Sequence, residues 1–498
     1  MITIELEKPV PYHVDYTKRK RRFDFWELSY CGGPDYKSGK DADGQNIFVD
    51  HEQESDKGTT RRKRLSVYRN YCRPVVQKYN NYIFSNPVSR PVMQDTTFKD
   101  FSDDVDLSGT TFADFIKHSG LWAAVLGQWF VLAESTKSDE GKTLAQAQVE
   151  SDRLYFIDID PRRVVNWEML GGKYTSLLID FPDESKARLY TDEKITTIDI
   201  DIKTKQVAKI TVEQNDFGQI PVEVCCVLED QQSQLADIAE VNKSLFNLDS
   251  LMREELQKQT FTQWFATIPR TSEDGQKPKL EDMSFGGRKI IFFEMQKDDT
   301  VTFTKLTSDV SQAESIRSSI TADIAEIYRL AGLQNPDVIQ NTESGRALKL
   351  RLNDTALNAA SIADRIEKFE NRLIKLWSIG MNPTAPQEFG ASDFPEDFNS
   401  EDLITDLEST LQVLDSDLPP TFKKEQVKYL ADRYFPKLNY DTKNELLAEI
   451  EDAFNSGQYD EAEPEPNQVQ APKPGAMYEP NKGTDYPVND NNDPNKGK

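Results

Sequence analysis

The residues best suited to acid–base or metal chemistry are the three histidines of this 498-residue sequence, His13, His51 and His118. None of them stands in an HExxH or HxH arrangement, which are spacings that bring two imidazoles to one metal ion. His118 falls near the apolar face of a predicted helix, where a histidine is usually a packing residue. The pattern therefore disfavours a histidine-based hydrolase.

Carboxylates offer a second kind of chemistry, because Asp158 and Asp160 stand two positions apart and nucleases hold divalent metals with such groups. Asp160 precedes Pro161, however, and a residue before proline favours extended backbone. We therefore expect Asp160 to shape the turn that ends a strand. The sequence also contains no GxxxxGK[ST] phosphate-binding loop, so the chain carries no P-loop motor.

The four cysteines lack the paired CxxC spacing of a zinc site and are too few for a disulfide scaffold. Cys225 and Cys226 lie in a β-branched run, where neighbouring side chains point to opposite faces, so we expect them to be buried as small apolar groups. We predict a reducing compartment, no metal, no cofactor and no enzymatic activity. The other two cysteines are Cys31 and Cys72.

The charge balance also limits the function, with 85 acidic and 60 basic residues and a formal net charge of −25. Nucleic-acid binding depends on Lys and Arg, so this balance opposes a tight grip on DNA, although it suits a protein that lets a polyanion pass. Basic clusters at 18–22 and 61–64 could contact DNA or a neighbouring subunit, or be solvated surface. The stretch between Lys375 and Lys423 contains acidic but no basic residues.

No run approaches the roughly 18 apolar residues of a membrane span, and residues 1–14 lack the pattern of a signal peptide. We therefore expect no membrane contact and synthesis in the host cytoplasm.

The first half of the chain is predicted to alternate between helix and sheet. Residues 1–60 read as an arm that ends in a short helix, and apolar spacing predicts helices at 61–83 and from Thr111 towards Trp129. Short β-branched runs between turn residues then predict antiparallel sheet. These runs lie at 154–159, 164–170, 176–180, 186–190, 194–200, 207–212 and 222–228.

The second half of the chain is mostly helical, so the whole chain is predicted to be α+β. A helical stripe from 230 to 268 predicts a rod of about 50 Å. An insert at 269–308 with strands at 289–294 and 300–305 separates it from a helix at 311–331, which ends at Gly332. A polar loop and a long helix at 345–379 follow. Further helices are predicted at 400–414, 423–434 and 441–454, and a proline-rich tail with almost no aliphatic residues begins at 462.

Four short segments resemble the portal proteins of tailed bacteriophages, the head-tail connectors, and they occur in the same order along the chain. Taken with the order of the predicted elements, the resemblance covers about residues 60–455, which makes the joint order more specific than any single match. The most specific is the last, because a similar run in portals follows the channel loop and begins the long wing helix. The segments are DPRRVVNW at 160–167, FGQIPV at 217–222, EVNKSLFNLD at 240–249 and ESGRALK at 343–349.

The resemblance implies a portal fold with a wing, long stem helices, a small clip and a helical crown. Outside it we expect an N-terminal arm (1–60) and a disordered tail (458–498). The parts it implies are a wing domain (61–229), a long helix entering the stem (230–268), a clip (269–308), a second stem helix (309–332), a channel loop (333–344), a long wing helix with its return segment (345–399) and crown helices (400–457).

The resemblance further implies a non-enzymatic ring of twelve subunits at one capsid vertex of the virion. Implied partners are other copies of the chain, double-stranded DNA in the channel, the packaging ATPase (terminase), a head-completion or tail adaptor protein, and the major capsid and scaffolding proteins. Amides that bind phosphates without holding them suit a channel through which DNA slides. The candidate DNA-channel residues are Gln334, Asn335, Gln340, Asn341 and Arg346, and the candidate clip contacts are Lys277, Lys279 and Arg288.

Two other interpretations stay open from the sequence. One is a metal-dependent DNA-processing enzyme that uses carboxylates such as Asp158. The other is a capsid or adaptor protein of a different structural type.

Overall fold

The computed structural model describes most of the chain outside its last 42 residues. For the distal strands and the first turns of the longest helix it describes the backbone alone. The described residues are 2–52, 54–85, 88–135, 154–260, 263–269, 284–285, 288–295, 303–306, 310–333, 345–383, 385–395, 403–416, 418–435 and 440–456.

The chain is α+β, as predicted, and its first part is a layer of helices around a shared apolar core. Residues 1–60 were predicted to be an arm, and this is wrong for most of the segment. Phe23, Phe25 and Trp26 of the first helix are buried in the core. The helix was missed because the run of basic residues before them made this part of the sequence look polar. The helices of this layer are α1 (Tyr16–Cys31), α2 (Gly33–Ser38), α3 (Asp56–Leu65), α4 (Cys72–Ile83), α5 (Thr96–Ser102) and α6 (Phe112–Leu126).

The single helix predicted at 61–83 is two helices, because the chain breaks between Leu65 and Cys72. Pro74 is the third residue of α4, and proline is tolerated in the first turn of a helix but not in its interior. The apolar spacing continues across the break, which is why the pattern alone did not reveal it.

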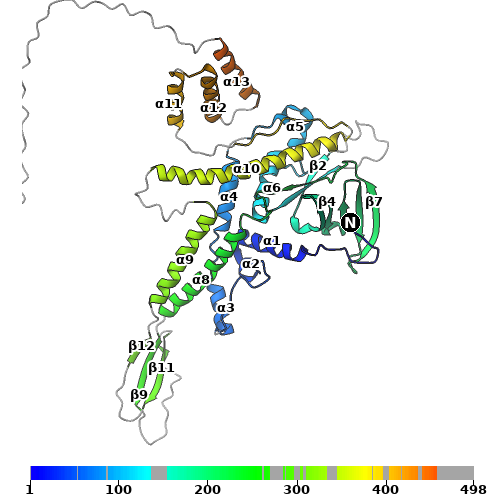
Figure 1. Cartoon of the computed structure of the whole chain (residues 1–498). Coiled ribbons are helices and arrows are strands. Elements are labelled where there is room, and N and C mark those ends of the chain that lie inside the picture. The colour runs from blue at the N-terminus through cyan, green and yellow to red at the C-terminus, as the bar shows by residue number, and fades with distance from the viewer. Residues whose placement is uncertain are drawn as a thin grey trace, which may run out of the picture.

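Two antiparallel sheets lie at the right of Figure 1, within the range that was predicted to be a wing domain, and this pair of sheets is called the wing from here on. Their strands match the predicted runs closely, and the β3–β4 connection is a two-glycine hairpin in which Gly171 and Gly172 have φ of 58° and 81°. One sheet has the order β2-β1-β8 and the other is a β3-β4-β5-β6-β7 meander. The strands are β1 (Trp129–Ser135), β2 (Leu154–Ile159), β3 (Val164–Leu170), β4 (Lys173–Phe181), β5 (Lys186–Tyr190), β6 (Lys194–Ile200), β7 (Val207–Gln214) and β8 (Val222–Cys225).

The wing sheets are covered on more than one side. Phe130 and Leu132 of the smaller sheet pack with Leu177 and Ile179 of the meander in one apolar cluster. A second cluster on the meander takes in the beginning of the chain, where Glu7 donates its backbone N–H to the carbonyl of strand β7 at 2.9 Å. The first residues therefore belong to the wing.

Two long helices project from this body and carry a small sheet at their far end (Figure 1). α8 (Ala236–Thr260) packs along α9 (Val310–Leu330). The helix predicted over 230–268 is therefore longer than α8 at both ends. The segment after Thr260 is rich in aromatic and β-branched residues, and these favour a strand. The distal sheet has the order β10-β11-β9-β12, with β11 parallel to β9. Its strands are β9 (Gln263–Pro269), β10 (Ser284–Phe285), β11 (Arg288–Met295) and β12 (Phe303–Leu306).

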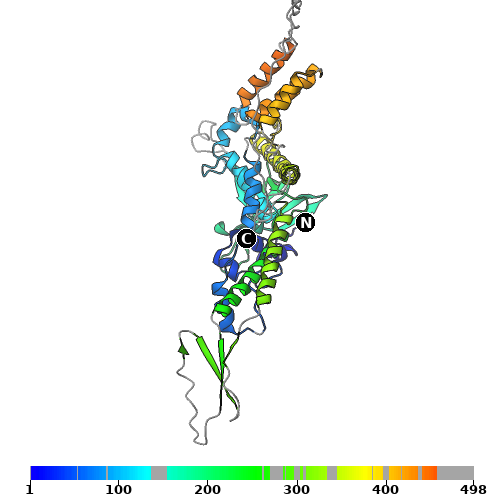
Figure 2. The same ribbon diagram turned by 90° about the vertical axis from the view of Figure 1, so that its left-hand side faces the viewer.

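The 37 residues of α10 (Gly345–Met381) form a rod of about 55 Å across the body. Its C-terminal half buries Ile366, Phe369 and Leu373 against α4, α6 and the smaller sheet, whereas its first turns extend beyond α4 (Figure 1). Three helices lie at the opposite end of the elongated molecule from the distal sheet (Figure 2). They are α11 (Leu403–Leu414), α12 (Pro420–Tyr434) and α13 (Tyr440–Asn455).

Candidate functional site

The end of α9 is a firmly held point, directly before the predicted channel loop. Gly332 has φ of 61°, its N–H donates to the carbonyl of Arg329 at 3.1 Å, and the N–H of Leu333 donates to Tyr328 at 2.9 Å. This pair of bonds is the Schellman ending, for which glycine is the preferred residue. A Cβ added at Gly332 would lie 2.6 Å from the side-chain nitrogen of Asn358.

Two further hydrogen bonds fix this ending to neighbouring helices. The buried hydroxyl of Tyr79 in α4 donates to the carbonyl of Ala331 at 2.7 Å, and Thr355 in α10 donates to the carbonyl of Gly332 at 2.8 Å. Burial raises the pKa of Tyr79, so its hydroxyl remains a donor. The chain therefore leaves α9 from a site where three helices meet.

The predicted loop residues themselves lie outside the described part of the chain. This holds for Gln334, Asn335, Gln340 and Asn341, and also for Lys277 and Lys279 in the predicted clip. Arg346 is the second residue of α10, and Arg288 begins β11 opposite Phe285. Arg288 thus lies in the distal sheet and Arg346 at the start of α10. The roles of both residues stay predictions.

The exposed residues of α9 include few cations. Its exposed residues are mostly small, and its only basic residues are Arg317 and Arg329. Arg329 donates its Nε–H to Glu326 at 2.7 Å, which leaves little positive charge there to hold a polyanion. The small exposed side chains are Ser315, Ser318, Ser319, Ala322 and Ala325.

The DPRRVVNW segment holds the first helix against the wing. Asp160 accepts the backbone N–H of Arg162 at 2.8 Å and so shapes the turn after β2, as predicted. The Arg162 guanidinium also pairs with Asp24 at 3.1 Å and with Glu27, both in α1. Hydrogen bonding to Asp160 above all, and then to Glu27, raises the pKa of Arg162. The segment is therefore a clamp between two parts of the fold.

The EVNKSLFNLD segment of α8 serves the same purpose for the linkers of the helical layer. Asn242 accepts the N–H of Tyr71 at 3.1 Å, and Asn247 accepts that of Val49 at 2.9 Å. Asp249 pairs with Arg69 at 3.0 Å, and the Nζ of Lys243 lies 2.6 Å from Asp41. Sequence reasoning singled out this segment only by resemblance. The signal that could have revealed these contacts is that Asn242 and Asp249 stand at buried positions of a helix, where apolar residues are expected.

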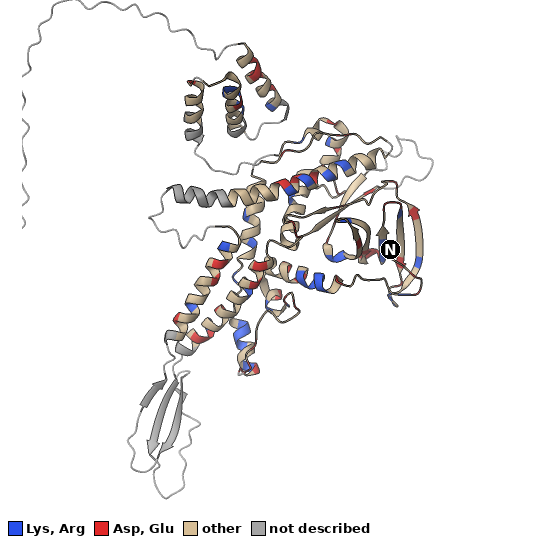
Figure 3. Cartoon of the chain, viewed as in Figure 1, with Lys and Arg blue, Asp and Glu red and all other residues tan. Residues whose placement is uncertain are grey.

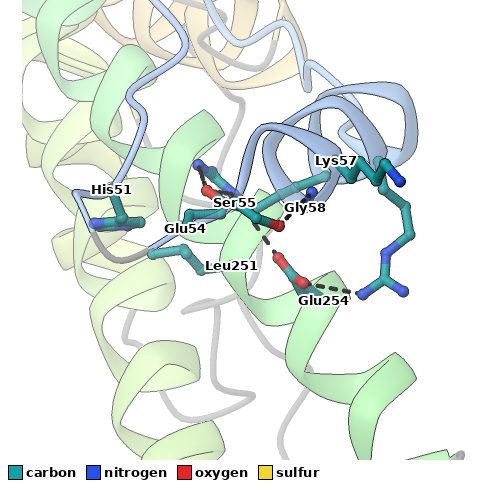
Figure 4. Close-up of a pocket in the computed structure, with 9 residues that line it drawn as sticks. His51, Glu54, Ser55, Lys57, Gly58, Leu251 and Glu254 are labelled. Atoms are coloured by element: carbon teal, nitrogen blue, oxygen red, sulfur yellow. Dashed lines mark hydrogen bonds and ion pairs between the residues drawn. The ribbon is translucent and has the colours of Figure 1, made fainter.

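The basic cluster at 61–64 is partly internal. The Arg62 side chain is 1% exposed, donates to Glu54 at 2.8 Å and to Ser250 at 2.9 Å, and lies 4.3 Å over the Phe48 ring. The pocket of about 650 Å³ beside it lies between α3 and α8 (Figure 4). Glu254 projects into this pocket from α8 and pairs with Arg61 at 3.1 Å. The cations here are balanced by carboxylates, so this cluster is a poor anchor for DNA.

The residues considered for catalysis are engaged in structure. Asp158 accepts the Trp129 indole N–H at 2.7 Å and lies 3.6 Å from half-exposed His118, and burial raises the pKa of this carboxyl. Cys225 is buried, as predicted, whereas Cys226 is only partly buried. Among the described residues, no three His, Cys, Asp or Glu side chains gather in a group that could hold a metal ion.

A family comparison identifies the fold to which these elements belong. The sequence model of the family described as "Phage portal protein, SPP1 Gp6-like" matches residues 15–379, which is most of the chain. The chain belongs to this phage portal family. The search of curated proteins gave no match.

The matched range of this portal protein begins at α1 and ends within the last turn of α10. It thus includes the helices that were predicted to be an arm, together with the wing, α8, α9 and the distal sheet. Membership of the family makes the protein a structural component of the phage capsid, at the head-tail connection. In the described part of the portal protein, no helix is both long and apolar enough to span a bilayer.

Proposed function

We propose that the chain forms a closed ring of twelve copies at one capsid vertex, around a channel for double-stranded DNA during packaging and ejection. One observation carries this proposal. The range matched by the portal family includes both the projection formed by α8 and α9 and nearly all of α10. In this proposal α8 and α9 are the stem, β9–β12 the clip, 333–344 the channel loop, α10 the wing helix, and α11–α13 the crown.

The electrostatics of the described stem support a channel that does not hold DNA. α9 presents small uncharged side chains, and the chain has a net charge of −25. A duplex in such a channel meets few cations, and amide groups in the loop would give weak, sequence-independent phosphate contacts. The anchored end at Gly332 sets where the loop begins, which suits a segment whose position relative to the channel matters.

The proposed crown supports assembly, because a single chain leaves its apolar side chains uncovered. In the described residues of α11–α13, Thr410 is the one buried side chain, whereas Leu411 is 52% and Phe422 51% exposed. Exposed apolar groups at this density mark an interface. In a ring, the heterologous contact with the next copy would cover them.

We further propose that the distal sheet and the outer surfaces dock the packaging ATPase, an adaptor protein, and the capsid and scaffolding proteins. The assembled ring belongs to the virion, with assembly in the host cytoplasm. The projection of the sheet away from the body makes it accessible to such partners (Figure 2).

Negative-stain electron microscopy of the purified full chain tests the ring. We expect closed rings with a central hole. Leu411→Glu places a charge on the uncovered crown face and should reduce the ring fraction, whereas Gln412→Glu adds the same charge at the next exposed position and should not. Monomers and dimers alone, at high concentration and several salt levels, would contradict the proposal.

The loop is tested separately by deletion of residues 336–342. We expect the deletion to leave rings intact and to impair DNA packaging or retention. Normal packaging with the shortened loop would remove the proposed role of this segment.

A further inference from the structure

A pocket of about 360 Å³ lies beside the first turns of α1, between this helix, the β3–β4 hairpin and residues 230–232. Lys18, Arg19 and Arg22 line it from one face of α1, because their spacing brings them to the same side of the helix. Figure 3 shows the Lys and Arg positions gathered along this helix. Two carboxylates, Asp15 and Asp230, also line the pocket, as do the aromatic side chains Phe23, Trp26, Trp167 and Tyr174.

Arg19 is the unusual member of this set, because it is largely enclosed yet has neutral partners. Its guanidinium donates to the Oε1 of Gln128 at 2.6 Å and lies 4.0 Å over the Trp167 ring. Burial lowers the pKa of Arg19, and Tyr174 and Asp15 oppose this shift. Among the described residues, no carboxylate oxygen lies within 4.0 Å of its nitrogens. A guanidinium has five N–H donors, so several remain for a ligand.

The surroundings of Arg19 are arranged to hold it in this position. Gln128 donates its own amide to Gln231 at 2.6 Å, so the acceptor of Arg19 is itself fixed. Gln231 has φ of 57°, a left-handed conformation that is costly for a residue with a side chain. Strain of this kind is concentrated at functional sites.

The position on α1 adds to the positive potential. The N-terminal end of a helix carries a partial positive charge, which favours acidic residues there. Asp15 stands at the N-cap of α1 and lines the pocket, but its side chain makes no capping hydrogen bond, and the first turn itself contains no acidic residue. Lys18 and Arg19 thus stand where cations are unfavourable, and a bound anion would offset that cost.

We propose that this pocket binds a carboxylate of an acidic segment in a partner protein, with an apolar residue beside it. The apolar part of the recognition is the hairpin next to the pocket, where Met169 is 42% and Leu170 76% exposed. A duplex fits these observations less well, since its phosphates seek protruding cations without apolar neighbours. An extended peptide can place one carboxylate in the pocket beside the guanidinium, which stays stacked on the Trp167 indole.

Fluorescence anisotropy with the full-length protein tests this site. The probe is a rhodamine-labelled peptide, acetyl-Leu-Glu-Asp-Glu-Leu-amide, compared with the analogue in which Gln and Asn replace the acids, and with a labelled 20-base-pair duplex. We expect the acidic peptide to bind, and Arg19→Gln to weaken it at least tenfold, because a charge-assisted hydrogen bond is lost. Lys18→Gln, an exposed change at the rim, should weaken binding by about two- to threefold.

Lys20→Gln is the matched control, because it removes one charge from the same helix without lining the pocket, and it should bind like the wild type. Circular dichroism checks that Arg19→Gln is folded. If Arg19→Gln is unfolded, the test rests on Lys18→Gln, which changes an exposed residue at the rim of the same pocket. The proposal is overturned if the acidic and amide peptides bind equally, if both pocket variants match Lys20→Gln, or if the duplex depends on Arg19 as strongly as the peptide does.

Discussion

Replacing Glu370 should show that one buried ion pair holds α10 to the rest of the body. Arg90, in the segment before α5, donates Nε–H to Oε1 of Glu370 at 2.7 Å and its terminal N–H to Oε2 at 2.9 Å. Ser392 donates to the same carboxylate at 2.6 Å. The Glu370 side chain is fully buried and that of Arg90 is 9% exposed. We predict that Glu370→Gln is strongly destabilising.

The magnitude follows from what the substitution leaves behind. The amide of Gln keeps the shape of the Glu370 side chain. It leaves the Arg90 guanidinium without a counter-charge in a site that excludes water. Breaking such a pair costs about 3–5 kcal/mol. Replacing both partners with apolar residues, as in Arg90→Met/Glu370→Leu, removes the unpaired charge. We therefore expect the double variant to be more stable than Glu370→Gln.

Hydrogen exchange of the α10 amides, together with urea unfolding followed by circular dichroism, measures this effect. Lys368→Gln is the control, because its exposed pair with Asp364 at 2.7 Å lies on the same helix and should contribute under about 1 kcal/mol. If Glu370→Gln costs no more than Lys368→Gln, the reasoning about the buried pair is refuted.

Three further changes test other contacts. Gly332→Ala, at φ of 61° and against Asn358, should cost about 1–2 kcal/mol and speed hydrogen exchange at the end of α9; unchanged exchange would contradict it. Hydrogen bonds from Arg62 lower the pKa of Glu54 from its usual 4.5, so the stabilisation is present above that pH and is lost as pH falls. The difference in melting temperature between the wild type and Glu54→Gln should therefore shrink below about pH 4.5, and a constant difference would argue against the ion pair. Arg162→Ala should release α1 from the wing and raise its proteolysis rate, which an unaltered digestion pattern would disprove.

The wing strands could be predicted from the sequence because each is short, β-branched and followed by a turn signal. The β3–β4 hairpin is an example, since two adjacent glycines supply the positive φ that its turn requires. The α8 region could not be bounded this way. An apolar series fits a helix and a buried strand equally well over a few residues, so the transition into β9 was missed.

The candidate site was predicted less completely, for a different physical reason. Arg19 and Arg62 each stand among other basic residues, and nothing local distinguishes them from their exposed neighbours. Which cation is enclosed depends on residues far away in the chain, such as Gln128, which is 109 residues from Arg19, and Ser250, which is 188 residues from Arg62. The channel loop was inferred through family resemblance, and its residues remain a prediction.

The position of the buried pair within α10 makes this helix an unequal lever. Glu370 lies about 16 Å from the C-terminal end at Met381 and about 37 Å from the N-terminal end at Gly345. A tilt about that pivot moves the N-terminal end more than twice as far as the other, in the opposite direction. A small shift of the wing at the far end of α10 would therefore be amplified at Gly345, where the proposed channel loop would rejoin the helix.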